Sequence, residues 1–204
     1  LRLGNQTLRT DGKNAFPLDY VYGIKVVSLG LLLPDQDEAV IWRGPLKMGV
    51  IRQFLADIQW GDLDYLIIDF PPGTGDEPLS VAQMLPESDG AVIVTTPQEV
   101  SLADVRKSIS FCRQVKVPVL GVVENMSGLN CPHCGKLIEL FKTGGGESMA
   151  KKLKVPFLGR IPLEPAVVEA SDSGLPFIYH YNQTGAAQAF REGIIKTILA
   201  LDDR

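Results

Sequence analysis

The sequence predicts an α/β fold with a mostly parallel sheet and helices on both faces. Short, continuous apolar runs alternate along the chain with segments whose apolar residues recur at helical spacing. Such runs are typical of strands that are buried on both faces of a parallel sheet, and their alternation with helices is the pattern of α/β proteins. The 204 residues, 45% of them hydrophobic, suffice for one domain with a sizeable core. We therefore expect a single domain over residues 1–204.

Each element follows from its local pattern. The run Tyr65–Phe70 (YLIIDF) is apolar except for one Asp, and Ser101 precedes a helical pattern with Asp104 at the capping-box position. The predicted strands, in chain order, are Gly23–Leu33 (followed by a loop within that range), Tyr65–Phe70, Gly90–Thr96, Pro118–Glu124 and Val155–Leu158. The predicted helices are Pro45–Trp60, Pro78–Leu85, Ser101–Val115, Gly146–Leu153, Pro165–Ser173 and Thr184–Leu201.

The composition excludes several classes of function. A formal net charge of −4 gives no basis for nucleic acid as the main partner. The longest apolar stretches fall well short of the ~20 residues that a membrane span needs, and the first residues lack the apolar core of a signal peptide. The polar side of the predicted last helix is acidic, which favours packing on the core over lying on a membrane. We expect a cytoplasmic protein without a membrane partner.

The end of the predicted strand Tyr65–Phe70 carries the most informative residues. Asp69 leads straight into a loop rich in proline and glycine that ends at Asp76. Ligands bind where loops splay apart at the carboxyl ends of parallel strands, and a carboxylate fixed there can hold the water shell of Mg²⁺ beside a nucleoside triphosphate. Glycines such as Gly73 let backbone N–H groups approach a γ-phosphate. A carboxylate that merely caps a turn or a helix explains Asp69 alone equally well.

Cys131 and Cys134 form a Cys-Pro-His-Cys pair in a loop expected at about residues 126–143. The odd total of three cysteines argues against a disulfide framework and for a reducing compartment. The pair fits half of a zinc site, a redox dithiol, or half of an iron–sulfur site. It follows a strand and a loop instead of opening a helix, which disfavours the redox dithiol. We expect His133 to be a solvent-facing spacer and Cys112 to be a buried packing residue.

The string IIDFPPGTGD at 67–76 resembles the signature of the Mrp family of ATPases, which are relatives of MinD and of the nitrogenase iron protein. The resemblance covers most of the chain. Its further motifs are WRGP at 42–45, PQE at 97–99, VENMS at 123–127, the cysteine pair, and IP at 161–162. It implies a P-loop NTPase fold of the MinD type.

Residue by residue, the resemblance implies a nucleotide site with ATP and Mg²⁺. Asp69 would be the carboxylate of the Walker B strand, Gly73 the switch glycine near the γ-phosphate, and Asp76 a polar residue of the same loop. Asn125 matches the family's base-recognising asparagine, whose amide can both donate to and accept from adenine. Two further residues would pack near the base: Pro162 and Leu163.

Two thiolates do not complete a four-thiolate shell, and the chain has no second pair. A symmetric dimer supplies four ligands when one pair from each subunit meets at the two-fold axis. This arrangement resembles the family's bridging [4Fe–4S] cluster, and zinc is accepted by the same ligands. An exposed cluster held by two cysteines per subunit is easily released, which suits a carrier that delivers it to apo iron–sulfur proteins.

A complete nucleotide site needs a Walker A loop, and the sequence contains none. The glycine-rich stretch Thr143–Met149 has no lysine at the required place after its glycines, so we predict a flexible entry into the next helix. In the Mrp family the Walker A loop precedes the region that this sequence matches. We therefore expect an N-terminally incomplete domain, poor ATP binding by these residues alone, and slow ATPase activity in the complete protein.

The leading hypothesis is an ATP-dependent carrier or scaffold that holds a [4Fe–4S] cluster between two subunits and transfers it to apo-proteins. Slow hydrolysis would act as a switch, because contacts to the γ-phosphate order the loop 69–76 and their loss loosens the dimer. Two rivals are a positioning ATPase of the MinD or ParA type and a non-catalytic module stapled by zinc. The cysteine pair argues against the first, and the second requires that the organism lacks the Walker A loop too.

Overall fold

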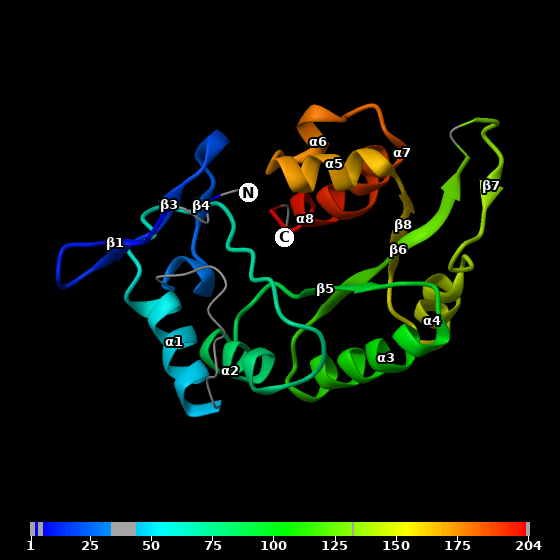
Figure 1. Cartoon of the computed structure of the whole chain (residues 1–204). Helices are drawn as coiled ribbons and strands as arrows, with labels where there is room; N and C mark the ends of the chain where they lie inside the picture. Colours follow the sequence, from blue (N-terminus) through cyan, green and yellow to red (C-terminus); the bar gives the residue numbers. More distant parts are fainter. Residues whose placement is uncertain (1–2, 4–5, 34–43, 132, 203–204) are drawn as a thin grey trace. The chain divides into compact units, whose positions relative to one another are not determined.

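The structure, a computed structural model, describes Leu3 and residues 6–33, 44–131 and 133–202. These residues fall into two compact units, an N-terminal unit up to Met84 and a C-terminal unit from Leu85 onwards (Figure 1). The loop from Asp69 to Asp76, called the acidic loop below, belongs to the first unit, and the cysteine pair belongs to the second. The predicted site residues are therefore divided between the two units.

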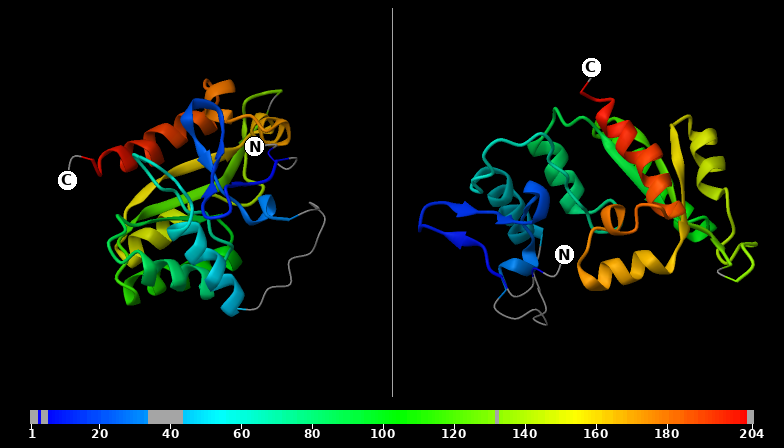
Figure 2. Two further views of the ribbon diagram at one scale, coloured as in Figure 1. Left: turned by 90° about the vertical axis from the view of Figure 1, so that its left-hand side faces the viewer. Right: turned by 90° about the horizontal axis from the view of Figure 1, so that it is seen from above.

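A four-stranded sheet forms the centre of the C-terminal unit (Figures 1 and 2). Strand β6 pairs in parallel with β5 on one edge and with β8 on the other, and its far end pairs antiparallel with β7. The bounds are Ala91–Thr95 for β5, Val119–Asn130 for β6, Leu137–Ile138 for β7 and Phe157–Leu163 for β8. Helices lie on both faces of this sheet, which confirms the predicted fold class.

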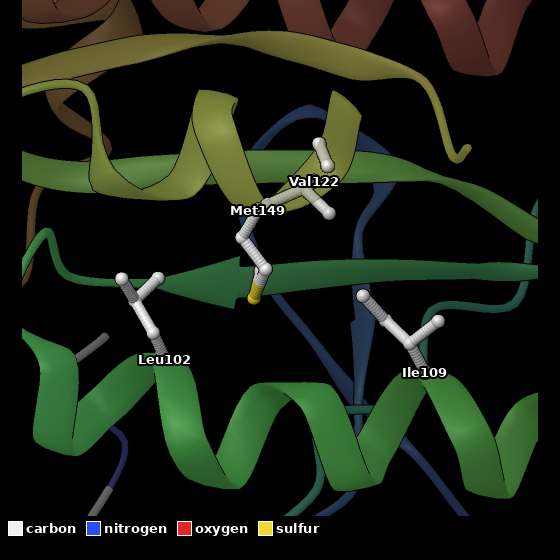
Figure 3. Packing of buried hydrophobic residues seen from close by; sticks show 5 residues of the cluster. Leu102, Ile109, Val122 and Met149 are labelled. Atoms are coloured by element: carbon white, nitrogen blue, oxygen red, sulfur yellow. The ribbon is translucent and has the colours of Figure 1, made fainter. Parts of the chain in front are cut away.

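Helices α3 (Glu99–Gln114) and α4 (Gly145–Leu153) cover one face of the sheet (Figure 1). Their apolar sides meet β6 in a core cluster that Figure 3 shows from close by. The buried members of this cluster are Leu102, Ile109, Val122, Met149 and Ala150. Burial of this apolar area holds the two helices on the sheet.

The opposite face of the sheet is covered by the C-terminal helical segments (Figure 2). These are α5 (Pro165–Ser173), α6 (Phe177–His180), α7 (Gly185–Ala189), the π-helical segment η3 (Phe190–Ile195) and α8 (Lys196–Leu199). Gly193 of η3 lies against β8 so closely that a Cβ at this position would be 2.3 Å from the carbonyl oxygen of Leu158. Only glycine permits this approach of helix and strand.

The described residues of the N-terminal unit form two short antiparallel ladders and two helices. β1 (Arg9–Thr10) pairs with β2 (Ala15–Phe16), and β3 (Leu18–Asp19) pairs with β4 (Lys25–Val26). Two 3₁₀ turns, η1 and η2, lie at Val21–Gly23 and Leu29–Leu31, and the helices are α1 (Gly44–Ala56) and α2 (Asp76–Met84). The predicted helices Pro45–Trp60 and Pro78–Leu85 correspond to α1 and α2.

Two predicted strands of the N-terminal unit are wrong. Gly23–Leu33 contains only the two-residue strand β4 and the 3₁₀ turn η2, and the structure has no strand over 65–70. A strand persists only where a neighbouring strand shares its backbone hydrogen bonds, and no ladder of the described residues includes 65–70. Ile67 of this run is 73% exposed. Apolar composition alone therefore did not decide the local structure.

The predicted cap of α3 is also wrong. The helix begins at Glu99 with Gln98 as its N-cap, two residues before the predicted start. Ser101 instead accepts a hydrogen bond from the Thr96 hydroxyl, and Asp104 pairs with Lys107 on the helix surface. The other predicted elements of the C-terminal unit correspond to β5, β6, α4, β8, α5 and the run α7–η3–α8.

The core cluster gives a first prediction. We expect Ile109→Ala to lower the free energy of unfolding by about 2–5 kcal/mol, because Ile109 is fully buried and its loss leaves a cavity. Ile109→Val should cost about 0.5–1.5 kcal/mol. Val100→Ala, on the same helix but 81% exposed, should stay within about 0.5 kcal/mol of the wild type. Urea unfolding measures all three, and equal effects at both positions would contradict this packing.

Candidate functional site

The cysteine pair lies at the tip of a β-hairpin. β6 continues past its predicted end to Asn130, and β7 returns antiparallel beside it, with Leu129 opposite Ile138 and Asn130 opposite Leu137. We call residues 128–143 the cysteine hairpin; the structure describes all of them except 132. Residues 126–130 of the predicted loop therefore belong to the central strand, and residues 137–138 of it form β7.

Backbone hydrogen bonds fold the tip of the cysteine hairpin around Cys131. The N–H of Cys131 donates to the carbonyl of Lys136 at 2.9 Å, and the N–H of Gly135 donates to the carbonyl of Cys131 at 2.8 Å. Cys131 is half-buried and Cys134 is exposed, and both are free thiols. The two sulfur atoms are accordingly available to a ligand from solvent.

The tip lowers the pKa of the Cys131 thiol below its ordinary value. The largest cause is the backbone N–H of His133, followed by the backbone N–H and the side chain of Cys134, all of which stabilise the thiolate. His133 contributes through its backbone, and its side chain is exposed, as predicted for a spacer. The thiolate is the form that binds metals, so the hairpin prepares Cys131 as a ligand.

One chain supplies only part of a metal shell. Among the described residues, no group of three or more His, Cys, Asp or Glu side chains could hold a metal ion. Cys112 is buried in α3, and burial raises the pKa of its thiol. The prediction that Cys112 is a packing residue is therefore confirmed.

The residues predicted to surround the base lie on two neighbouring parallel strands, with Asn125 in the middle of β6 and Pro162 and Leu163 at the end of β8. Asn125 of β6 is the register partner of Ile161 of β8, the residue before Pro162. Further along, Leu129 is the partner of Leu163. The Asn125 side chain accepts a hydrogen bond from the N–H of Met126 at 2.9 Å. The structure thus places Asn125 and Pro162 on neighbouring strands of the sheet.

The acidic loop belongs to the N-terminal unit, where Asp69, Gly73 and Asp76 are all exposed. Gly73 has a φ of 105°, a backbone conformation that side chains other than glycine rarely adopt. Asp76 begins α2, and its carboxylate lies at the start of α1, 2.8 Å from where a Cβ of Gly44 would be. This position beside helix N-termini suits a negative charge.

A second contact joins the same helices. Lys47 of α1 lies 2.7 Å from the carboxylate of Glu77 in α2, and this hydrogen bond lowers the pKa of Glu77 below its ordinary value. The acidic loop is therefore anchored at its far end by contacts between α1 and α2. Arg43, which also matches the family motif, lies outside the described residues.

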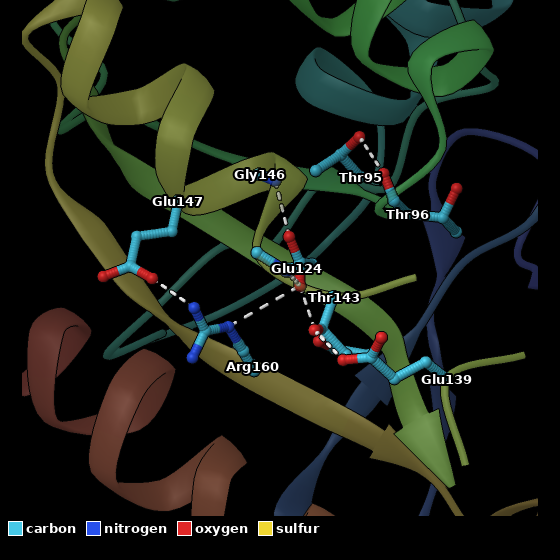
Figure 4. A network of polar contacts seen from close by, with 10 residues as sticks. Thr95, Thr96, Glu124, Glu139, Thr143, Gly146, Glu147 and Arg160 are labelled. Atoms are coloured by element: carbon cyan, nitrogen blue, oxygen red, sulfur yellow. Dashed lines mark hydrogen bonds and ion pairs between the residues drawn. The ribbon is translucent and has the colours of Figure 1, made fainter. Parts of the chain in front are cut away.

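The glycine-rich stretch Thr143–Met149 is more ordered than predicted. Gly144 is the N-cap of α4 in the left-handed conformation, and a Cβ at Gly145 would lie 2.4 Å from the carbonyl oxygen of Pro97. The N–H groups of Gly144 and Gly146 donate to the buried carboxylate of Glu124 (Figure 4). The chain's own carboxylate thus occupies the anion-binding end of this helix.

Glu124 is the residue that the sequence reading missed. It lies in the VENMS motif immediately before Asn125, where only the asparagine was given a role. The signal was present in the sequence, because a carboxylate at the end of the apolar run PVLGVVE needs partners if that run is a buried strand.

No helix of the described residues is long and apolar enough to cross a membrane.

The fold and the cysteine hairpin together define an α/β protein that carries a thiol pair on an extension of its parallel sheet. The comparison with protein families is specific on this point. A model of the ParA family, described as NUBPL iron-transfer P-loop NTPase, matches residues 1–199, and the chain belongs to this family.

Two curated relatives carry the same printed description, iron–sulfur cluster carrier protein. The protein of Methanocaldococcus jannaschii is 56% identical over 163 residues, which are 80% of this chain and 56% of that protein. The protein of Methanococcus maripaludis is 47% identical over 189 residues, which are 93% of this chain and 64% of that protein. The chain thus spans little more than half to two-thirds of the length of these relatives.

Solved structures support the same fold. A nucleotide-binding protein of Archaeoglobus fulgidus, in complex with ADP and with cobalt, is 41% identical with a TM-score of 0.70, over 84% of this chain and 66% of that one. The cell-division ATPase MinD of Pyrococcus furiosus is 24% identical with a TM-score of 0.54, over 80% of this chain and 63% of that one. The MinD likeness establishes the fold alone, and it confirms the predicted MinD-like class.

The lowered pKa of Cys131 gives a second prediction. At pH 7 we expect iodoacetamide to alkylate Cys131 faster than Cys112, by about ten-fold for each unit that separates their pKa values. As the pH rises, the rate at Cys131 should level off below the pH at which an unfolded cysteine does so, because its thiolate forms earlier. Mass spectrometry of quenched samples measures each site.

The control for this prediction is the same chain in concentrated denaturant. There the backbone donors and the burial are lost, so the two cysteines should react at similar rates. A Cys131 that titrates like an unfolded cysteine in the native chain would contradict the hydrogen-bonded tip.

Proposed function

We propose that this chain is part of an ATP-dependent carrier that holds a [4Fe–4S] cluster between two copies and passes it to apo iron–sulfur proteins. The observation that carries the proposal is the exposed Cys131–Cys134 pair, with its lowered Cys131 pKa, in a member of an iron-transfer family. The cluster is the cargo of this protein. One family model over residues 1–199 supports the further proposal that residues 1–204 belong to a single nucleotide-binding domain.

The second copy is required by the number of ligands. A [4Fe–4S] cluster takes four thiolates, and each chain offers two at its hairpin tip, so a two-fold axis through the cluster completes the shell. Apolar side chains beside the pair support a protein partner at this place. The exposed ones on the cysteine hairpin are Leu137, Ile138, Leu140 and Phe141.

The residues proposed for nucleotide binding come from the loop 69–76 and from the paired strands β6 and β8. Asp69 holds the water shell of Mg²⁺, Gly73 lets the backbone approach the γ-phosphate, and Asp76 is a polar residue of the same loop. Asn125 recognises the base, and Pro162 and Leu163 pack against it. The register of β6 with β8, which places Asn125 beside Ile161, supports the grouping of the base-contacting residues.

ATP works as a switch in this proposal. The γ-phosphate orders the loop from Asp69 to Asp76, and slow hydrolysis releases it and loosens the dimer. The contacts of α1 with α2 support a fixed position for Asp76 at the end of the loop. The part of the loop that changes conformation is then the segment from Asp69 to Gly75. We place this cycle in the cytoplasm, where thiols stay reduced.

A positioning ATPase of the MinD type is the alternative on the same fold. The likeness to MinD concerns the fold, whereas the curated relatives at 56% and 47% identity are described as cluster carriers. The exposed cysteine pair also argues against a positioning ATPase. The observations therefore favour the carrier.

Reconstitution tests the proposal. Anaerobic incubation with iron and sulfide should load about two iron atoms per chain, one four-iron cluster per dimer, with the visible absorbance of such a cluster. The variant Cys131→Ser/Cys134→Ser should load none, because both thiolates are gone, and Cys112→Ser should load as the wild type does. Zinc in place of iron, or iron indifferent to the pair, would leave a nucleotide switch with a structural hairpin.

The same samples test the dimer. Loaded wild type should sediment at twice the mass of one chain, and the double cysteine variant should remain a monomer. Leu140→Ser should weaken dimerisation at least about ten-fold, because burial of a leucine contributes about 1.5–3 kcal/mol. Val168→Ser, an exposed apolar residue of α5, is the matched control and should change nothing. A loaded monomer would refute the shared cluster.

A further inference from the structure

Glu124 is a fully buried carboxylate in the middle of the central strand. It is 0% exposed, and it follows Val122 and Val123, which are buried in the core. A carboxylate in such surroundings is destabilising unless hydrogen bonds and opposite charge compensate for the lost water. The groups that bind the Glu124 carboxylate therefore indicate which parts of the structure it holds together.

Three hydrogen bonds and one ion pair converge on Glu124. Its Oε1 accepts from the hydroxyl of Ser127 at 2.5 Å and from the N–H of Gly144 at 2.8 Å. Its Oε2 accepts from the N–H of Gly146 at 2.5 Å. The guanidinium of Arg160, the register partner of Glu124 on β8, lies 3.7 Å from Oε1 (Figure 4). All donors to the carboxylate thus come from β6, β8 and the start of α4.

Two of these partners are the feet of the cysteine hairpin. Ser127 precedes residues 128–143 on β6, and Gly144 follows them at the start of α4. Both donate to the same oxygen atom, Oε1 of Glu124. One buried atom therefore joins the residue that precedes the cysteine hairpin to the residue that follows it. We call this arrangement the Glu124 clamp.

The hairpin has few other means of holding its position. β7 contributes only two residue pairs to the ladder, and a two-stranded hairpin of this size is marginally stable by itself. The pairing of β6 with β8 is interrupted between Asn125 and Leu129, directly at the base. Met126 and Gly128 have positive φ angles there, so the strand changes direction. The clamp lies across this irregular segment.

We propose that Glu124 is a positioning residue that fixes the cysteine hairpin, and through it the spacing and direction of Cys131 and Cys134, to the central strand. The metal-binding part of this inference rests on the proposed function. The geometry of the clamp does not, because it involves only the chain's own atoms. Glu124 touches neither thiol and acts through the base of the hairpin.

The clamp also connects the two predicted sites of the C-terminal unit. Asn125 is the next residue after Glu124, and Cys131 follows one residue after the end of the same strand. Glu124, Asn125 and the base of the cysteine hairpin thus lie on one continuous strand.

Ser127→Ala tests the clamp with the smallest change. It removes one donor to Glu124 and leaves the N–H groups of Gly144 and Gly146 in place. Ser101→Ala is the matched control. It also removes a partly buried hydroxyl, which makes a 2.7 Å hydrogen bond with Thr96 in the same unit but outside the hairpin. Both are made in the full chain, with thermal unfolding as the measure of general stability.

Amide deuterium exchange of the iron-free chain is the first readout. In Ser127→Ala we expect faster exchange over the hairpin, above all at Leu129 and Ile138, by about ten-fold for one lost hydrogen bond to a charged group. Exchange in α4 should change less, and Ser101→Ala should leave the hairpin unchanged. Faster exchange confined to α4 would mean that Glu124 merely caps that helix, and the proposal would fail.

Iron release from the reconstituted chain to a chelator is the second readout. We expect Ser127→Ala to release iron several-fold faster than Ser101→Ala, with absorbance that still reports a bound cluster at the start. Glu124→Gln should release iron faster still, because its amide group places a donor against the N–H of Gly146. Glu147→Gln alters only the exposed partner of Arg160 and should release iron at the wild-type rate.

The two readouts separate the clamp from the proposed function. If the wild type binds no iron, the proposed function fails, and the exchange experiment still decides the clamp. If the wild type binds iron but Ser127→Ala matches Ser101→Ala in both exchange and release, the clamp is refuted. Should Glu124→Gln fail to fold, Ser127→Ala carries the test by itself.

Discussion

The pairing of β6 on both edges is the constraint on which the C-terminal unit depends. Because β5 and β8 both run parallel to it, the middle of β6 has no free edge, and its side chains are committed to the helices above and below the sheet. A strand held in this way can carry residues at its end without losing its register. Asn125 lies on this strand, and the cysteine hairpin continues from its end.

A buried charge is an unusual component for such a strand. An apolar residue at position 124 would pack against the core at no electrostatic cost, whereas the carboxylate needs four partners to be tolerated. Those partners belong to three separate elements, β6, β8 and the start of α4. Glu124 therefore fixes the relative positions of these elements. Apolar packing alone would define these positions less sharply, because it is not directional. Arg160 extends this arrangement to the surface through its pair with Glu147.

The sequence predicted the C-terminal unit well because local pattern and tertiary packing agree there. The apolar runs at 90–96 and 118–124 find neighbours in one sheet, so periodicity and structure coincide. In the N-terminal unit the same kind of run at 65–70 forms no strand, since a strand depends on its partners as much as on its own residues. The cysteine pair could be found from spacing, but the extension of β6 to Asn130 could not, because the segment ENMSGLN lacks the apolar alternation of a strand.

For the candidate site residues, too, short motifs could be found in the sequence, whereas the contacts around them could not. Asp69, Asn125 and Cys131 stand in short strings that specify chemistry, so the sequence points to each of them. The partners that orient these residues are distributed along the chain. Ser127 and Gly144 meet at one oxygen atom although the whole hairpin separates them, and no periodicity in the sequence encodes that contact.

The proposed carrier function imposes two opposed requirements, and the cysteine hairpin is suited to both. It must hold its cargo firmly enough to avoid loss to solvent, yet present it to a recipient without unfolding. Thiolates at the tip of a short hairpin are accessible, and backbone donors stabilise the thiolate of Cys131. Firmness then has to come from the base, where the ladder ends and the strand bends. A carboxylate that binds both feet there sets the stiffness of the hairpin independently of the thiols, so retention and accessibility are governed by different residues.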